Sequence, residues 1–565
     1  MKFWLGLLLA CLLLTKGFTQ PNPSLSPEQI QAYAQIGKTW GFLKFYHPQV
    51  ASGALNWDQA LIQALQNESH PSPQTMSRRV VQELLTLAGP VENCRTCLNQ
   101  VGSTFSQTVD WAWLSDTAYI SASQSVFLKR IRDQRDAKDS IHRHYIQTWK
   151  GGSFKFILDS TYQEIGAFTP AERLLPLFHY WNVIEYFSPY KPSIHPHWDQ
   201  VLIEFIPQFL NAEGKRAMHY TMWELTSRLK DSHGAGGSGY LYEHGYGKFW
   251  LPFWARLSED KDVFITQSRS DSLFQASNLQ VGDQILQING QDVRQLLDDK
   301  RPFVSASNAT AEDIYALWKI LQDTLPWAEL TLKRHEEVFV QKIARQEPSQ
   351  FHTGRLPTWY WADSAHEILV VQNQAIRSSK QARKVLSQAK AAKAIIMDFR
   401  QGSMPYDAMT HFQTRMTQNE APSANYYFSK FSFPGYWSSK GIQQTFSRRS
   451  KHWKEKELIL LVGEYNISRD EWWIMRFQTS PQAYTIGRST GGALSYMAKI
   501  QLVGGYAANF TMGGMTYPDG SPIFGPGVKL DERVEPSSQQ LREGRDADLE
   551  RALEYLTSKP QVRTN

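Results

Sequence analysis

The chain is poor in cysteine. Its 565 residues include 3, at Cys11, Cys94 and Cys97, which is too few for a small scaffold held together by disulfides. Cys94 and Cys97 lie in the stretch ENCRTCLN. A redox-active Cys-x-x-Cys pair usually follows a strand and opens a helix. Because that context is missing, we interpret the two cysteines as a local structural disulfide formed in an oxidising compartment.

Long apolar runs and one-sided charge are also missing. Apart from the N-terminus, no segment approaches the roughly 18 apolar residues that a membrane-spanning helix needs. The 60 basic and 54 acidic residues leave a formal net charge of +6, and no run of lysine and arginine is longer than a pair. A nucleic-acid partner is therefore not expected, and no pattern in the chain indicates a cofactor.

The N-terminus is the exception. Residues 1–20, MKFWLGLLLACLLLTKGFTQ, join one basic residue to an apolar core and lead into polar, proline-bearing sequence, which is the layout of a secretory signal. We expect export to the periplasm or cell envelope, with no transmembrane helix after signal removal. Lipid anchoring at Cys11, which ends a lipobox-like LLAC, is the alternative, but the apolar run that continues beyond it disfavours anchoring.

The length predicts several domains, since one hydrophobic core rarely supports so many residues. Residues 25–240 read as mainly helical and contain an internal repeat. The stretch that begins at Trp40 aligns without gaps with the stretch that begins at Trp181, and it pairs Trp57 with Trp198. Shared aromatic and proline positions indicate packing rather than chemistry.

A second region, residues 247–346, centres on SNLQVGDQILQINGQDV. Its pattern predicts a strand, a turn at Asn289-Gly290 and a short second strand. The stretch resembles a PDZ domain. The resemblance implies a β-rich module that captures an extended peptide at a sheet edge.

From residue 350 to 557 the pattern changes to short apolar strands that alternate with helices, which predicts an α/β layer. The strands are EILVVQN, AKAIIMDFR, LILLVGEYN and AYTIGRST, and the helices include SKQARKVLSQAKAAK and RDEWWIMRFQTS.

Two interpretations of Ser468 are open. It follows the run LILLV within GEYNISRDEWWIMRF. Ser-x-x-Glu before an apolar helix is a capping box, in which Ser468 and Glu471 satisfy backbone amides. A serine between a strand end and a helix N-terminus can equally be a nucleophile, because the helix dipole and unpaired amides stabilise an oxyanion there.

The order of the motifs resembles the C-terminal processing peptidases and tricorn core peptidases, a superfamily of serine peptidases with a crotonase (ClpP)-like catalytic domain. The resemblance covers about residues 220–560 and rests on Ser-x-x-Glu after a strand, then IGRSTGG, then YPDGSPIFGPGVKLDERVEP. It implies Ser468 as the nucleophile, with Glu471 at the matching acidic position. The amide of Arg469 would be one oxyanion donor, and Gly402 in DFRQGS the second, although that loop lacks the family's asparagine and paired glycines.

The same resemblance identifies the general base. The processing peptidases use a lysine just after Gly-x-x-Thr-x-Gly, where this chain has Ala493. The tricorn-like branch uses a histidine in a Ser-His pair before the PDZ domain, which falls on Ser232 and His233. Its orienting glutamate falls on Phe524, so the third triad member has no counterpart.

A zinc site is the remaining alternative. His142 and His144, and likewise His195 and His197, have ligand-like spacing but no cysteines or carboxylates beside them. We therefore expect solvated loops and no metal.

The sequence thus predicts an exported serine endopeptidase that cleaves peptides or unfolded protein tails through an acyl-enzyme. The alternative is an impaired peptidase fold that binds peptide or another ligand. Oligomeric state is not predicted.

Overall fold

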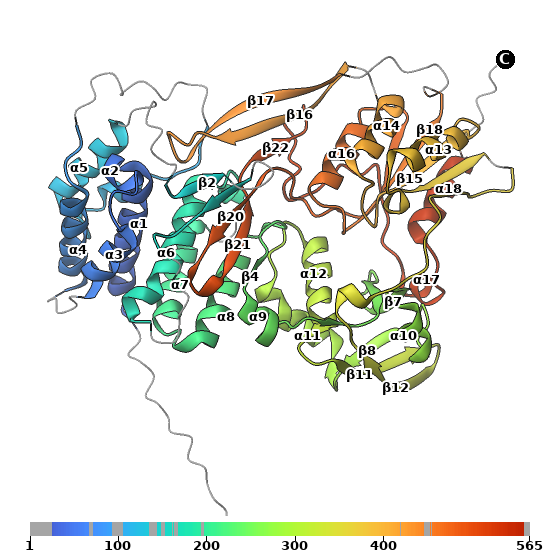
Figure 1. The fold of residues 1–565 in the computed structure, drawn as a ribbon, viewed down its shortest axis with the longest axis horizontal. Coiled ribbons are helices and arrows are strands. Elements are labelled where there is room, and N and C mark those ends of the chain that lie inside the picture. The colour runs from blue at the N-terminus through green and yellow to red at the C-terminus, as the bar shows by residue number, and fades with distance from the viewer. Residues whose placement is uncertain are drawn as a thin grey trace, which may run out of the picture.

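The computed structural model arranges the chain in three neighbouring regions: N-terminal helices, a small β-rich domain and an α/β domain (Figure 1). Residues 1–20, with Cys11, lie outside the described residues, as do Cys94 and Cys97. No helix in the described part of the chain has the length and apolarity to cross a bilayer. The structure describes residues 25–66, 72–92, 106–134, 144–148, 153–160, 162, 168–193, 197–365, 367–417, 420–445, 453 and 455–558.

The N-terminal region is mainly helical, as predicted. Ser26, Ser72 and Thr169 each accept a hydrogen bond from the third amide of the following helix, and a proline occupies the first helical position each time. Such caps define where a helix begins. The main helices are α1 (Pro27–Tyr46), α3 (Trp57–Gln66), α4 (Pro73–Ala88), α5 (Ala122–Asp133), α6 (Pro170–Phe187), α7 (Trp198–Leu210) and α8 (Gly214–Ser227).

The two copies of the sequence repeat form the same local structure. In the first, Trp40 Nε1 donates to the Trp57 carbonyl at 2.9 Å and Trp57 Nε1 donates to the Trp40 carbonyl at 3.0 Å. In the second, Trp181 and Trp198 exchange the same pair of bonds at 2.9 and 3.0 Å. The repeated tryptophans therefore join α1 to α3 and α6 to α7.

The β-rich domain contains the predicted hairpin, in which β8 (Gln284–Ile288) pairs with β9 (Gln291–Asp292) across the Asn289-Gly290 turn. Its sheet has the order β12-β11-β8-β7-β6, so β6 (Phe253–Leu257) is an edge strand. The other elements are β5 (Phe249–Trp250), β7 (Val263–Ser268), α10 (Asp271–Ala276), α11 (Val293–Lys300), α12 (Ala309–Leu321), β10 (Gln322–Asp323), β11 (Trp327–Arg334) and β12 (Glu337–Ala344).

The α/β domain is built on a sheet of order β13-β14-β15-β18-β19-β23, parallel except at β13. Its central strands are the four predicted apolar runs. The strands are β13 (Trp359–Trp361), β14 (Ile368–Gln372), β15 (Ala394–Asp398), β18 (Glu457–Val462), β19 (Ala483–Gly487) and β23 (Glu532–Arg533); the helices are α13 (Ser379–Ala389), α14 (Tyr406–Met416), α16 (Arg469–Phe477), α17 (Ser538–Arg542) and α18 (Ala547–Ser558).

Two further sheets join the α/β domain to the N-terminal helices (Figure 1). One has the order β2-β3-β20-β21-β4, and its C-terminal strands share a hydrophobic core with α6. The other has the order β1-β17-β16-β22. Their strands are β1 (Ser106–Gln107), β2 (Ile146–Thr148), β3 (Phe154–Phe156), β4 (Gly236–Gly237), β16 (Glu420–Ser429), β17 (Tyr436–Thr445), β20 (Met497–Gln501), β21 (Ala507–Thr511) and β22 (Gly514–Thr516).

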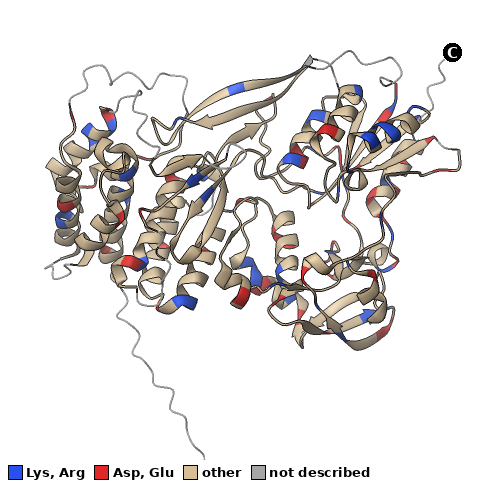
Figure 2. Cartoon of the chain, in the orientation of Figure 1, with Lys and Arg blue, Asp and Glu red and all other residues tan. Residues whose placement is uncertain are grey.

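Charges of both signs are interspersed over all three regions (Figure 2). One pair is fully buried: Lys44 Nζ lies 2.8 Å from Asp58 Oδ1 and 3.9 Å from Asp159 Oδ2. The backbone amides of Asp58 and Asp159 also donate to each other's carboxylates, at 3.0 and 2.7 Å. This cluster connects the first helical repeat to the chain that follows β3.

Lys44→Met is expected to destabilise the protein by about 3–5 kcal/mol, because it leaves two buried carboxylates without their cation. Urea unfolding measures the loss. The control is Lys38→Met, since Lys38 pairs with the half-exposed Asp199 and such pairs contribute about 1 kcal/mol or less. Equal effects of the two substitutions would contradict this account.

Candidate active site

Ser468 occupies the turn between β18 and α16, and its backbone is strained. Its φ is 59° and its ψ is −112°. Three other serines that cap helices here, Ser26, Ser121 and Ser537, have φ between −68° and −76° and ψ between 155° and 161°. A non-glycine residue in the sparsely populated region costs about 1–3 kcal/mol and typically marks a functional position. The backbone of Ser468 therefore differs from that of these capping serines.

Glu471 holds this turn in place. Its carboxylate is fully buried and accepts the Ser468 amide at 3.0 Å, which is the predicted half of the capping box. It also accepts the Thr490 hydroxyl at 2.5 Å and the amides of Gly492 and Ala493 at 2.7 and 3.1 Å. Three of these four hydrogen bonds connect the start of α16 to the loop after β19.

The two predicted oxyanion donors differ in their surroundings. The Arg469 amide is at the first position of α16, where an N–H has no intrahelical acceptor. The Gly402 amide is engaged in this structure, because it donates to the Phe399 carbonyl at 2.7 Å. Gly402 has φ 110° and closes a tight turn after β15, while Ser403 of the same loop donates its hydroxyl to Asp470.

Ser232 and His233 follow α8 and approach the same loop after β19. The Ser232 hydroxyl donates to the Gly491 carbonyl at 2.5 Å, while the Ser468 amide donates to the Ala493 carbonyl at 3.1 Å. One residue, Gly492, lies between these two acceptors. Ser468 and the predicted Ser232-His233 pair are therefore both hydrogen-bonded to the loop after β19.

His233 is 6% exposed, and burial lowers its pKa although nearby Asp231 acts in the opposite direction. Its Nδ1 lies 2.8 Å from Thr511 Oγ1. Its Nε2 is buried and has no hydrogen-bond partner among the described residues. The Ser468–His233 hydrogen bond is thus not formed in this structure, and such bonds are often long or absent without substrate.

Two neighbours of the histidine, Asp231 and Thr511, were not predicted from the sequence. Asp231 stands two positions before His233 in KDSHG, and this short spacing could have indicated it. Thr511 is remote in sequence, so no local pattern points to it. Phe524, at the position of the family's orienting glutamate, stacks on Tyr190 with ring centroids 3.7 Å apart. An aromatic pair therefore occupies that place.

The segment before α12 supports the histidine loop. Ser305 donates its hydroxyl to the Asp231 carbonyl at 2.7 Å, and Ser307 exchanges two 2.9 Å hydrogen bonds with Ser232. Asn308 Nδ2 donates to the carbonyls of Thr490 and Gly525 at 2.9 and 2.7 Å. The PDZ-like domain is therefore hydrogen-bonded directly to the candidate active site.

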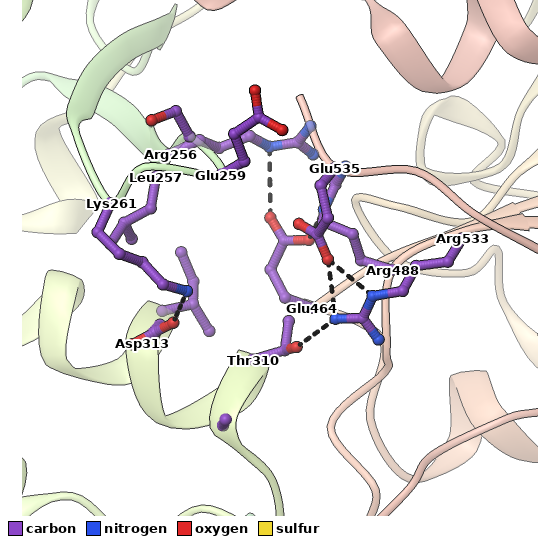
Figure 3. A pocket seen from close by; sticks show the side chains of 13 residues that line it. Arg256, Leu257, Glu259, Lys261, Thr310, Asp313, Glu464, Arg488, Arg533 and Glu535 are labelled. Carbon is purple, nitrogen blue, oxygen red and sulfur yellow. Dashed lines mark hydrogen bonds and ion pairs between the residues drawn. The ribbon is translucent and has the colours of Figure 1, made fainter. Parts of the chain in front are cut away.

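A cavity of about 320 Å³ lies between β6, α12 and the α/β domain (Figure 3). Glu464 reaches it from the segment that precedes Ser468 and pairs with Arg256 at 3.3 Å and with Arg488 at 2.8 Å. Burial opposes its ionisation, but Arg488 and Arg256 lower the pKa of Glu464 to about 2. Next to it, Tyr465 stacks on Trp318 of α12 with centroids 5.4 Å apart.

The zinc alternative gains no support. His142 and His195 lie outside the described residues. Among the residues that are described, no three metal-ligating side chains form a group.

Glu471→Gln is expected to change the pH dependence of stability. Burial raises the pKa of Glu471 from 4.5 to about 7, so the folded protein binds a proton that the unfolded chain releases. This contribution is complete below pH 4.5 and is lost as the pH rises to about 7, by about 3 kcal/mol. Denaturant titrations of wild type and Glu471→Gln from pH 4 to 8 measure the difference in slope. Exposed Glu554→Gln is the control, and equal slopes for all three proteins would contradict the assignment.

Comparison with known proteins identifies the two C-terminal domains. Residues 367–534 match the model of peptidase family S41, and residues 246–308 match that of the PDZ domain. No curated protein sequence matches the chain.

Among solved structures, mature CPAF complexed with lactacystin superposes with a TM-score of 0.54 at 12% identity, over 68% of this chain and 97% of that one. A putative peptidase from Parabacteroides merdae gives 0.44 at 12% identity, over 71% and 100%. The photosystem II D1 C-terminal processing protease gives 0.39 at 14%, over 68% and 99%. The CPAF likeness shows a shared fold. The helical region, a domain that matches the PDZ model and a domain that matches the model of peptidase family S41 therefore follow one another in the expected order.

Proposed function

We propose that the protein is an exported serine endopeptidase in which Ser468 is the nucleophile and His233 the general base. His233 Nε2 takes the Ser468 hydroxyl proton as Oγ attacks the scissile carbonyl. It then protonates the leaving amine, and water hydrolyses the acyl-enzyme by the reverse proton transfers.

The strained backbone of Ser468 carries this proposal. A cap needs no positive φ, and the capping serines Ser26, Ser121 and Ser537 have extended backbones. Ser468 follows the parallel strand β18 by six residues and caps α16, and Glu471 accepts a hydrogen bond from its amide. A nucleophile presented above a sheet requires such a turn.

The base is suited to its task. Burial lowers the pKa of His233, so the imidazole is neutral at physiological pH, as a proton acceptor must be. Its unpartnered Nε2 is free to accept the serine proton when substrate completes the site.

The Arg469 amide is the first oxyanion donor, assisted by the N-terminal end of the α16 dipole. Because the Gly402 amide donates to the Phe399 carbonyl in this structure, a second donor requires the loop after β15 to rearrange when substrate binds. With one amide alone, the tetrahedral intermediate is stabilised less and the reaction is slower.

Peptides or unfolded protein tails are the proposed substrates. β6 is an edge strand of the PDZ domain, and an extended peptide binds such an edge by backbone hydrogen bonds. Glu464, four residues before Ser468, lines the cavity beside β6 (Figure 3).

The rival function is a binding protein that keeps this scaffold without chemistry. The engaged Gly402 amide and Phe524 in place of an orienting acid favour it.

Ser468→Ala is expected to reduce hydrolysis of casein-derived peptides by about a thousandfold or more, as loss of a nucleophile does. Cleavage is followed by mass spectrometry of the products. Ser387→Ala is the matched control, because Ser387 is exposed on α13 and bonds only its own helix; it should cleave at the wild-type rate. Undiminished cleavage by Ser468→Ala would show that another group does the chemistry, and a wild type without activity on any peptide would favour the binding protein.

Export is proposed from residues 1–20. Expression with the native leader should yield a protein in the exported fraction whose N-terminus, by sequencing, lies near residue 21, and Cys11→Ser should leave that location unchanged. Retention of the leader, or a lipid adduct at Cys11 by intact mass, would contradict this proposal.

A further inference from the structure

A three-residue hydrogen-bonded chain ends at His233. Thr511, the last residue of β21, donates its hydroxyl to Asp231 Oδ1 at 2.8 Å. The same hydroxyl oxygen lies 2.8 Å from His233 Nδ1. Asp231 Oδ1 also accepts the His233 amide at 2.9 Å, and Oδ2 accepts the Thr511 amide at 2.5 Å.

The proton count fixes the imidazole tautomer. A hydroxyl has one proton, and an ionised carboxylate only accepts hydrogen bonds. The Thr511 hydroxyl therefore uses its one proton to donate a hydrogen bond to Asp231. Its oxygen is then an acceptor toward His233, and Nδ1 has to carry the ring proton. The lone pair consequently sits on Nε2, which is the unpartnered nitrogen.

The chain is buried throughout. Asp231 is 2% exposed, Thr511 is fully buried and His233 is 6% exposed. In such surroundings hydrogen bonds and charges act more strongly than in water. A negative charge at Asp231, relayed by one hydroxyl dipole, favours the imidazolium that forms when a base takes a proton.

Two buried tyrosines near Asp231 stay neutral. Tyr315 of α12 and Tyr190, which follows α6, lie near both Asp231 and Glu471, and burial raises the pKa of each tyrosine. Asp231 is the charged group that acts on His233 among the described residues.

We infer that Thr511 and Asp231 together replace the orienting acid whose place Phe524 occupies: Thr511 accepts the His233 Nδ1 proton in a hydrogen bond, and Asp231 holds Thr511 in the accepting orientation. Both are positioning residues, and the inference rests on the proposed role of His233 as base. The acid of the triad is thus Asp231, which lies in the same loop as His233 and acts on it through the Thr511 hydroxyl.

Thr511→Val tests the relay, because valine keeps the shape and removes the hydroxyl. Without its acceptor the imidazole loses its preferred tautomer, and its imidazolium loses support. The rate of Ser468 labelling by a fluorophosphonate should fall at least about tenfold, within the range of up to about ten thousandfold known for orienting acids, and its acid limb should move to lower pH. Thr511→Ser should restore most of the labelling rate and the wild-type position of the acid limb in the pH profile.

The control is Thr39→Val, which should match wild type. Thr39 is also a buried threonine, and its hydroxyl is hydrogen-bonded within α1.

An independent measurement separates this inference from the proposed function. Long-range ¹⁵N–¹H correlation spectra of ¹⁵N-histidine-labelled protein, with His233 assigned by His233→Gln, should show the Nδ1-protonated tautomer in wild type and its loss in Thr511→Val. This holds whether or not the protein cleaves peptides. A wild type protonated at Nε2, or a Thr511→Val protein with unchanged tautomer, rate and pH profile, would overturn the relay. Equal losses in Thr511→Ser and Thr511→Val would show that Thr511 only fills space. A wild type with the expected tautomer that fails to label would overturn the proposed function alone.

Discussion

The buried carboxylate of Glu471 is the constraint on which the site depends. It accepts hydrogen bonds from the Ser468 amide and from three groups of the loop after β19. The strain at Ser468 persists only because its surroundings over-determine it. The same loop receives the Ser232 hydroxyl, so one acid aligns the serine with the segment that carries the histidine.

The site is assembled from all three regions of the chain. Ser468 and Glu471 belong to the α/β domain, and Ser232 and His233 follow the last N-terminal helix. Ser305 and Ser307 of the PDZ region are hydrogen-bonded to the histidine loop, and Asn308 is hydrogen-bonded to Thr490 and Gly525. A displacement of α12 would therefore move Asp231 and Ser232. The stacking of Tyr465 on Trp318 gives the same helix a second contact, three residues before Ser468.

Local patterns in the sequence predicted most of the fold. The four apolar runs became β14, β15, β18 and β19, and the Asn289-Gly290 turn joins β8 to β9, because apolar runs and turn residues act over a few positions. The repeat predicted paired helices, and its tryptophans form equivalent hydrogen bonds. The prediction that Ser468 and His233 belong to one site came from the resemblance to a family, because no local pattern connects two residues so far apart in the sequence. The motif that suggested Gly402 does not reveal that its amide closes a turn in this structure. Thr511 was missed since only the packing of β21 against the histidine loop brings it to His233.

The central claim is that the strained Ser468 is an activated nucleophile with His233 as its base. The most direct measurement is intact-mass analysis of the full-length protein after treatment with a fluorophosphonate, followed by peptide mapping of the adduct. The account predicts a single phosphonyl adduct on Ser468, formed in wild type and lost in His233→Ala. No adduct, or an adduct on Ser468 that forms equally fast without His233, would contradict it.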